Sequence, residues 1–214
     1  MRIALAQFNS IIGDFENTTS KIIQRIHDAE SQGADLIVFP ELAVCGYPPE
    51  DYLEYPNFIH KCKQSAETIA LECKNITAII GLPTVNPNAE GKNLYNSAAI
   101  LSAGKISSYI HKSLLPTYDI FDEARYFEPA SSIQVWKHSS GRRIGVAICE
   151  DLWAEDSGRF NQGKPLYKTN PLDRIRALQP DLLLSVSASP YEWGKRSRRE
   201  SLHGEIAQRL KPPL

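Results

Sequence analysis

The sequence predicts a layered α/β domain with mixed sheets, and three observations support this class. Apolar runs typical of buried strands alternate with amphipathic segments of helical period in the first third of the chain. Further along, three strand candidates follow one another with short connections, as antiparallel pairing requires. With 214 residues, 42% of them hydrophobic, the chain is long enough for one well-packed domain and too short for two large ones.

The N-terminal elements alternate between strand and helix. The segment RIALAQF reads as a first strand, and a helix follows over NTTSKIIQRIHDAESQG, with Asn17 or Thr18 as its cap and Gly33 as its end. ADLIVFP is the next apolar strand. A proline-rich loop, ELAVCGYPPEDYLEYP, then leads to a second helix near residues 57 to 74.

Strands predominate in the middle of the chain. TAIIGLP, LYNSAAILS and KISSYIH are three strands in succession, and a hairpin turn at residues 103 to 105 joins the last two. After a polar loop come SIQVWK, a turn at residues 139 to 141, and a strand that ends at Cys149. The polar, glycine-bearing segment 155 to 170 predicts a surface excursion. A short helix near 171 to 178, the strand DLLLSVSAS and a basic helix near 195 to 210 follow.

The charge composition argues against nucleic-acid and membrane partners. Lys and Arg number 24 against 25 Asp and Glu, which gives a formal net charge of -1. No apolar run approaches the roughly 18 residues that a membrane span needs, and MRIALAQFNS lacks the apolar core of a signal peptide. We therefore expect a soluble, cytoplasmic protein whose partner is a small molecule or another protein.

The four cysteines, at positions 45, 62, 73 and 149, show no CxxC spacing and no neighbouring histidine. The pattern therefore predicts neither a zinc site nor a disulfide framework, and free thiols suit a reducing compartment. Cys62 and Cys73 fall at helical spacing that suits a buried stripe. They are interpreted as core residues.

Three reactive side chains each come just after an apolar strand: Glu41, Lys112 and Cys149. Ligand sites in α/β sheets gather at strand ends, so these groups converge if their strands are neighbours. A carboxylate, an ammonium and a thiol suffice for acyl transfer, with a base, an oxyanion-stabilising cation and a nucleophile. The acids at 150 and 151 should raise the pKa of the thiol, so Cys149 needs a positive charge from elsewhere, which Lys112 can supply. The backbone N–H of Glu150 is a further candidate donor to the oxyanion.

Each of these residues also has a plainer explanation. A cysteine at a strand end is commonly a small buried hydrophobe, and Glu41 and Lys112 taken singly fit a solvated loop acid and a surface cation. Cys45 is a rival nucleophile in a loop, without a basic residue near it in sequence. His111 precedes Lys112, but strand alternation turns it away from the candidate site.

Three segments carry a resemblance to a known family: FPELAVCGYPPEDYL, HKSLLPTYDIFDEARYFEP and GVAICEDLW. Together they resemble the nitrilase superfamily of carbon-nitrogen hydrolases, and within it the N-terminal glutaminase domain of glutamine-dependent NAD synthetase. The FPE and CED motifs are shared across the superfamily, whereas GYPPEDYL and LLPTYDIFDEARYF are specific to the NAD synthetase branch. The resemblance covers residues 1 to about 210. It implies a nitrilase-like four-layer αββα sandwich that pairs into a homo-oligomer.

The resemblance also implies roles for individual residues. Glu41 matches the general base, Lys112 the cation on the oxyanion side, and Cys149 the nucleophile that forms a glutamyl thioester and releases ammonia. It further implies six substrate-binding positions: Tyr118, Ser189, Lys195, Phe121, Glu150 and Tyr47.

Among these six, Tyr118 matches the glutamine-binding tyrosine of the family, and Ser189 and Lys195 match positions that hold the amino and carboxylate ends of the substrate. A cation at position 195 suits a free α-carboxylate. Two plainer explanations stay open. Tyr47 also fits a packing aromatic, and Lys195 also fits a solvated member of the basic run GKRSRRES.

The chain departs from this branch at its C-terminus. Members of the branch continue, after the equivalent of KPPL, with the last strands of the hydrolase domain and then with a synthetase domain whose SGGxDS loop binds ATP. Prolines at 212 and 213 are typical of the lead-in to a strand, and no SGG occurs in the 214 residues. The resemblance thus implies one incomplete hydrolase domain over residues 1 to 214. Its glutaminase step needs no cofactor, because ATP and Mg belong to the absent synthetase domain.

Three functions follow. The first is hydrolysis of the side-chain amide of L-glutamine to supply ammonia for NAD synthesis. The second is hydrolysis of another small amide or nitrile, for which Lys195 has no use. The third is a catalytically inert, truncated chain with a role in assembly.

Overall fold

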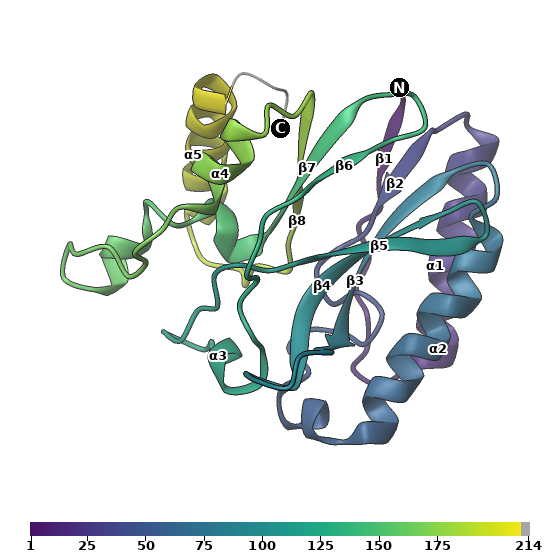
Figure 1. The fold of residues 1–214 in the computed structure, drawn as a ribbon, viewed down its shortest axis with the longest axis horizontal. Helices are drawn as coiled ribbons and strands as arrows, with labels where there is room; N and C mark the ends of the chain where they lie inside the picture. Colours follow the sequence, from purple (N-terminus) through teal and green to yellow (C-terminus); the bar gives the residue numbers. More distant parts are fainter. Residues whose placement is uncertain (211–214) are drawn as a thin grey trace.

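Two β-sheets stacked face to face form the centre of the molecule, and helices cover the outer face of each (Figure 1). The computed structural model describes residues 1–210, apart from the side chains of residues 159 and 160. The expectation that KPPL leads into a further strand concerns residues 211–214, which lie outside the described residues.

The first sheet has five strands in the order β1-β2-β3-β4-β5, and the second has three in the order β6-β7-β8. The strands are β1 (Ile3–Leu5), β2 (Leu36–Val38), β3 (Thr77–Val85), β4 (Leu94–Ser102), β5 (Lys105–His111), β6 (Val135–Lys137), β7 (Arg143–Ile148) and β8 (Leu182–Val186). The α-helices are α1 (Phe15–Ser31), α2 (Pro56–Glu72), α3 (Glu123–Tyr126), α4 (Pro171–Ala177) and α5 (Lys195–Leu210). Short 3₁₀ helices occupy η1 (Glu50–Glu54), η2 (Cys149–Leu152) and η3 (Ser157–Phe160).

Strand direction decides where side chains gather. In the first sheet β1, β2 and β3 are parallel, whereas β4 is antiparallel to both β3 and β5, so β2, β3 and β5 all run the same way. In the second sheet β7 and β8 are parallel. The C-terminal ends of β2, β3 and β5 therefore lie at one edge of the first sheet.

Three hydrophobic clusters separate four layers. The first cluster, which includes Ile22, Ile69 and Ile80, lies between helices α1 and α2 and the first sheet. The second includes Ile100 and Ile148 and lies between the sheets. The third joins the second sheet to α4 and α5 through residues such as Leu183, Leu172 and Ile206. The predicted αββα sandwich with mixed sheets is confirmed.

Some predicted boundaries are wrong. Helix α1 begins at Phe15, and its N-cap is Asp14, whose side chain accepts a hydrogen bond from the Asn17 N–H, in place of the expected Asn17 or Thr18. Asp14 is the N-cap because its carboxylate accepts a hydrogen bond from an N–H of the first turn that has no partner within the helix. The helix ends as predicted, and Gly33 has a φ of 73°.

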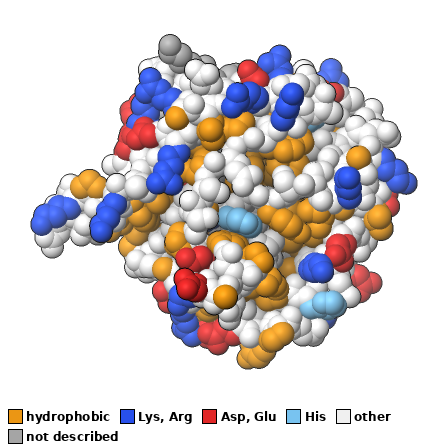
Figure 2. All heavy atoms as spheres, viewed as in Figure 1, with side chains coloured by type: hydrophobic (Ala, Val, Ile, Leu, Met, Phe, Trp, Pro, Cys, Tyr) orange, Lys and Arg blue, Asp and Glu red, His pale blue; other side chains and the backbone are white. Residues whose placement is uncertain are grey.

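Hydrophobic side chains are not confined to the interior. Figure 2 shows them gathered in the middle of the viewed face, with charged side chains mainly around them. Tyr191 and Trp193 are 88% and 90% exposed. No helix within residues 1–210 has the length and apolar character that crossing a membrane requires.

Candidate active site

Glu41 enters the interior because the chain turns sharply after β2. The next residue, Leu42, has a φ of 50°, a left-handed conformation that redirects the backbone. Gly81 of β3 leaves room for this turn, since a Cβ there would lie 2.3 Å from the backbone nitrogen of Leu42. The Glu41 side chain is buried, and its Oε2 accepts a hydrogen bond of 3.2 Å from the Ala188 N–H, just beyond β8.

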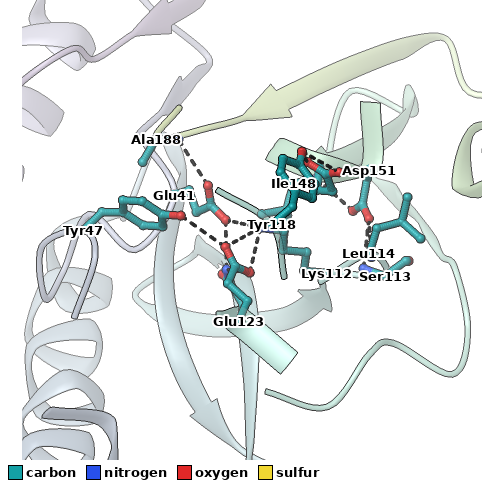
Figure 3. A network of polar contacts seen from close by, with 12 residues as sticks. Glu41, Tyr47, Lys112, Ser113, Leu114, Tyr118, Glu123, Ile148, Asp151 and Ala188 are labelled. Atoms are coloured by element: carbon teal, nitrogen blue, oxygen red, sulfur yellow. Dashed lines mark hydrogen bonds and ion pairs between the residues drawn. The ribbon is translucent and has the colours of Figure 1, made fainter. Parts of the chain in front are cut away.

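Lys112 directly follows β5 and is fully buried. Its backbone N–H still donates to the Asn96 carbonyl at 2.8 Å, which extends the pairing of β4 with β5. Its Nζ donates to Glu41 Oε1 at 2.7 Å and to both carboxylate oxygens of Glu123 at 2.8 Å. Figure 3 shows these three side chains pointing toward one another from separate segments. We call Glu41, Lys112 and Glu123 the charge cluster.

Glu123 is the member of the charge cluster that the sequence did not reveal. It is the first residue of α3, and no strand end marks it. Two neutral groups secure it, because the Tyr47 hydroxyl donates to its Oε1 at 3.3 Å and the Asn96 amide donates to its Oε2 at 3.4 Å and to Glu41 at 2.9 Å. Its segment resembles the family, but the neighbouring acids Asp119 and Asp122 lie in the same segment, so no signal in the sequence singles out Glu123.

The charged members of the charge cluster shift one another's pKa values. Burial opposes a positive charge on Lys112, but Glu41 and Glu123 outweigh it and hold the pKa of the ammonium well above its usual range. Burial raises the pKa of Glu123; Lys112 opposes this change and Glu41 adds to it. The ammonium is therefore charged at every physiological pH, while Glu123 is the acid that takes up a proton more readily than an ordinary carboxylate.

The three predicted strand ends meet, but their strands are not neighbours. Strands β3 and β4 separate β2 from β5, and β7 belongs to the other sheet. The ends converge because β2 and β5 run in the same direction and the two sheets are stacked. The sequence predicts convergence only if the strands are neighbours, and the three groups converge although that condition is not met.

Cys149 directly follows β7 as the first residue of η2, and it has a φ of 45°, a conformation rarely adopted by residues other than glycine. The Asp151 carboxylate holds this turn: Oδ2 accepts from the Ile148 N–H at 3.0 Å, and Oδ1 accepts from the N–H groups of Ser113 and Leu114 at 3.0 and 2.9 Å (Figure 3). Asp151 thereby ties the turn that carries the thiol to the segment that follows β5.

The thiol of Cys149 is buried and rests in its neutral form. Burial raises its pKa well above the usual range and Glu41 raises it further, whereas Lys112 and a hydrogen bond with the Ser187 side chain lower it. Glu41 therefore raises the pKa of the thiol more than the adjacent acids Glu150 and Asp151, to which the sequence analysis attributed the rise. Because the thiol is protonated near neutral pH, a nucleophile forms here only when a base removes the proton.

A pocket of about 160 Å³ opens beside Cys149, and we call it the Cys149 pocket. Five of the residues that the sequence singled out for substrate binding line it: Tyr118, Phe121, Glu150, Ser189 and Lys195. The sixth, Tyr47, does not line it, because the tyrosine lies on the other side of the charge cluster against Glu123.

Glu150 is the buried acid of the Cys149 pocket, whereas Asp119 and Glu192, which also line it, are exposed. Its carboxylate accepts hydrogen bonds from the Tyr118 hydroxyl at 2.9 and 2.8 Å and from the Tyr167 hydroxyl at 2.8 Å. Burial raises the pKa of Glu150, and both hydroxyls lower it. Tyr167 belongs to the predicted surface excursion, where nothing in the sequence marked it.

Lys195 carries a positive charge to the same pocket from the first residue of α5. Its Nζ donates to the Pro190 carbonyl at 3.1 Å and lies 5.8 Å from the centre of the Trp153 ring. Arg198 lies over the same ring at 5.5 Å and pairs with Asp156. The Cys149 pocket therefore presents both signs of charge next to a thiol.

The rival residues lie elsewhere. Cys45, Cys62 and Cys73 are fully buried in hydrophobic clusters, and burial raises the pKa of Cys45 well above its usual range. The His111 side chain points away from the charge cluster. Its Nδ1 contacts Ser97 Oγ at 2.8 Å, and its ring stacks on that of Tyr95. Among residues 1–210, no group of three His, Cys, Asp or Glu side chains is arranged to hold a metal ion.

Residues 2–164 match the family model described as carbon-nitrogen hydrolase. The chain is 40% identical over 216 aligned residues to a glutamine-dependent NAD(+) synthetase of Synechocystis sp., covering 99% of this chain and 38% of that protein. It is 36% identical to a protein of the same name from Acinetobacter baylyi, covering 98% of this chain and 35% of the relative. The chain thus spans little more than a third of these relatives.

Solved structures agree with the sequence relatives. A glutamine-dependent NAD+ synthetase from Acinetobacter baumannii superposes with a TM-score of 0.84 at 35% identity, over 98% of this chain and 36% of that one. An amidase of the nitrilase superfamily from Nesterenkonia shares the fold with a TM-score of 0.75 at 21% identity, over 97% of this chain and 71% of that one.

Proposed function

The chain belongs to the carbon-nitrogen hydrolase family, and on this premise we propose that it hydrolyses the side-chain amide of L-glutamine through a Cys149 thioester. One observation carries the choice of substrate. Next to the thiol, the Cys149 pocket holds a carboxylate, Glu150, and an ammonium, Lys195. Their opposite charges complement the α-ammonium and the α-carboxylate of an amino acid, and simple amides carry neither group.

In the first half of the proposed reaction, Glu41 takes the proton of Cys149 and the thiolate attacks the amide carbon. The carbonyl oxygen becomes an oxyanion, which the Lys112 ammonium and the backbone N–H of Glu150 stabilise. The protonated Glu41 then gives its proton to the departing nitrogen. Ammonia leaves, and a γ-glutamyl thioester remains on Cys149.

Lys112 can serve the oxyanion without losing its own partners. An ammonium has three N–H groups, and at rest these face one oxygen of Glu41 and two of Glu123. Exchanging one of the two contacts with Glu123 for the oxyanion leaves Glu123 paired through the other. Glu123 is thus proposed to hold Lys112 in place while sparing one donor.

In the second half, Glu41 takes a proton from water, whose oxygen attacks the thioester carbon, and the same two donors stabilise the second oxyanion. The carbon–sulfur bond breaks, and Cys149 regains a proton from Glu41. The sum is glutamine plus water giving glutamate plus ammonia. The side chains and water supply every group that these steps use.

The use of the ammonia is also a proposal. The relatives are named glutamine-dependent NAD(+) synthetases, and the chain spans little more than a third of their length. We propose that the ammonia supplies a synthetase unit that makes NAD+ with ATP and Mg²⁺, and that copies of this chain associate. Light scattering of the purified chain measures that association.

The test of the reaction is ammonia release from L-glutamine by the purified chain, with Cys149→Ala beside it. We expect the substitution to lower kcat by at least about 10⁴-fold without loss of the folded circular-dichroism spectrum. Cys73→Ala, a matched change of another buried cysteine, should keep the activity. Comparable turnover in Cys149→Ala would contradict the thioester, and a folded wild-type chain that releases no ammonia would favour the inert alternative.

Lys195→Met separates glutamine from other amides as the substrate. If Lys195 binds the α-carboxylate, its loss should raise KM for L-glutamine about tenfold or more with little change in kcat, because the reacting atoms lie at the other end of the substrate. Butyramide, which lacks the α-carboxylate, should be hydrolysed equally by both proteins. Wild-type preference for butyramide over glutamine would favour the alternative amidase.

A further inference from the structure

The negative side of the Cys149 pocket depends on a residue far from the recognised motifs. Figure 1 shows the segment between η3 and α4 projecting from the body of the molecule. Within this segment Tyr167 is half-buried, and its hydroxyl donates to Glu150 Oε1 at 2.8 Å. The projecting segment thus sends one side chain back to the residue that follows the thiol.

Glu150 needs more than one donor because its carboxylate is almost fully buried, with 3% of the residue exposed. A buried carboxylate stays ionised only when hydrogen bonds or charges replace the lost water. The Tyr118 hydroxyl reaches both carboxylate oxygens, and Tyr167 supplies a second hydroxyl to Oε1. These two phenols, from segments about 50 residues apart in sequence, hold the carboxylate group from two sides.

The surrounding charges do not replace these donors. Lys112 lowers the pKa of Glu150 and Glu41 raises it, so these two members of the charge cluster act against each other. Asp119 and Glu192 also line the pocket, but an ionised carboxylate donates no hydrogen bond to Glu150. Lys195 and Arg198 share the pocket, but Lys195 is engaged with the Pro190 carbonyl and Arg198 with Asp156. The two phenols are therefore the hydrogen-bonded partners of the carboxylate.

We propose that Tyr167 is a positioning residue for substrate selection, which keeps the Glu150 carboxylate ionised and directed at the α-ammonium of the substrate. This inference rests on the proposed glutaminase function. It adds that the choice of an α-amino acid over an otherwise identical amide is made partly by the projecting segment. Tyr167 itself does not line the Cys149 pocket.

Two substrates isolate this role. L-Glutamine and 5-amino-5-oxopentanoate have the same amide and the same carboxylate, and only glutamine carries the α-ammonium. Loss of one hydrogen bond to a charged group predicts that Tyr167→Phe lowers kcat/KM for glutamine about tenfold, mainly through KM. The same change should alter kcat/KM for 5-amino-5-oxopentanoate by less than about twofold, because Glu150 has no partner on that substrate.

The pH dependence of KM gives an independent readout. Removing a donor that favours the ionised form raises the pKa of Glu150 further, so the loss of glutamine affinity on acidification should begin at a higher pH in Tyr167→Phe than in the wild type. Tyr55→Phe removes a hydroxyl from an exposed tyrosine before α2 and should change neither the ratio nor the profile.

The outcomes separate the two proposals. If the wild type hydrolyses glutamine and Tyr167→Phe leaves the preference between the two substrates unchanged, the positioning role is wrong and the glutaminase function stands. Equal losses on both substrates would show a merely structural role and would also overturn the inference. If the wild type does not hydrolyse glutamine and Cys149→Ala does not bind it in calorimetry, the proposed function is wrong and the inference falls with it.

Discussion

The charge cluster and the Cys149 pocket lie side by side, but they are held in different ways. Lys112, Glu41 and Glu123 are 0%, 1% and 7% exposed, and two of them are fixed by the ends of paired strands. The pocket residues Tyr118 and Lys195 are only half-buried, and loops and the start of a helix carry them.

This difference separates chemistry from recognition. A group fixed in the core has the same position whatever substrate is present, so changes in the charge cluster should affect kcat for every amide. A group on a loop is free to vary in sequence without unfolding the sheets, so changes in the pocket should affect KM for particular substrates. The following substitutions test whether that division holds.

Lys112→Met should have the largest effect of the substitutions that follow. It removes the cation proposed to stabilise the oxyanion and should lower kcat at least about 100-fold for glutamine and for any other amide hydrolysed. It also leaves two buried carboxylates without their partner, which should lower the free energy of unfolding by about 3–5 kcal/mol. Steady-state kinetics and urea unfolding measure the two effects. Full activity of Lys112→Met would show that Lys112 does not stabilise the oxyanion.

Gly81→Ala should have an intermediate effect, because it acts on the charge cluster through the backbone. The added methyl group would meet the Pro40 carbonyl oxygen at 2.6 Å and the Leu42 nitrogen at 2.3 Å, so the turn that carries Glu41 must shift. We expect kcat to fall about tenfold and the free energy of unfolding to fall by about 1–3 kcal/mol.

Gly204→Ala is the matched control. A Cβ at this position in α5 would meet nothing within 4 Å, so activity should be unchanged and stability should be equal or higher. If Gly81→Ala behaves like Gly204→Ala, the turn at Glu41 is more adaptable than its contacts indicate, and the contrast between core and loop weakens.

The parts of the site that the sequence could predict are those fixed by local pattern. Apolar runs located β2, β5 and β7, so Glu41, Lys112 and Cys149 could be placed at strand ends before any fold was known. Their convergence required the stacking of two sheets, which no local pattern contains.

Residues that reach the site from loops could not be found in this way. Glu123 and Tyr167 lie 11 and 17 residues along the chain from their partners, in segments that contain no strand. Tertiary contacts, not periodicity, set the path of these segments. The cap of α1 was missed for a simpler reason, since Asp14 and Asn17 both suit an N-cap and only the backbone path decides between them. The hydrophobic pattern of the sequence therefore predicts the site residues at strand ends better than those, such as Glu123, that segments between strands carry.

Apart from the control, Arg125→Ala should have the smallest effect, and it tests whether α3 is held from the surface or from the core. Arg125 lies two residues after Glu123 and pairs with Asp51 at 3.0 Å and Glu54 at 3.4 Å, but all three side chains are at least half exposed. Exposed ion pairs contribute little and are screened by salt, so kcat and KM should change by less than about twofold, and added salt should shrink any difference. A loss of kcat beyond tenfold would mean that Glu123 depends on this surface tie. The buried contact with Lys112 would then not be what holds Glu123 in place.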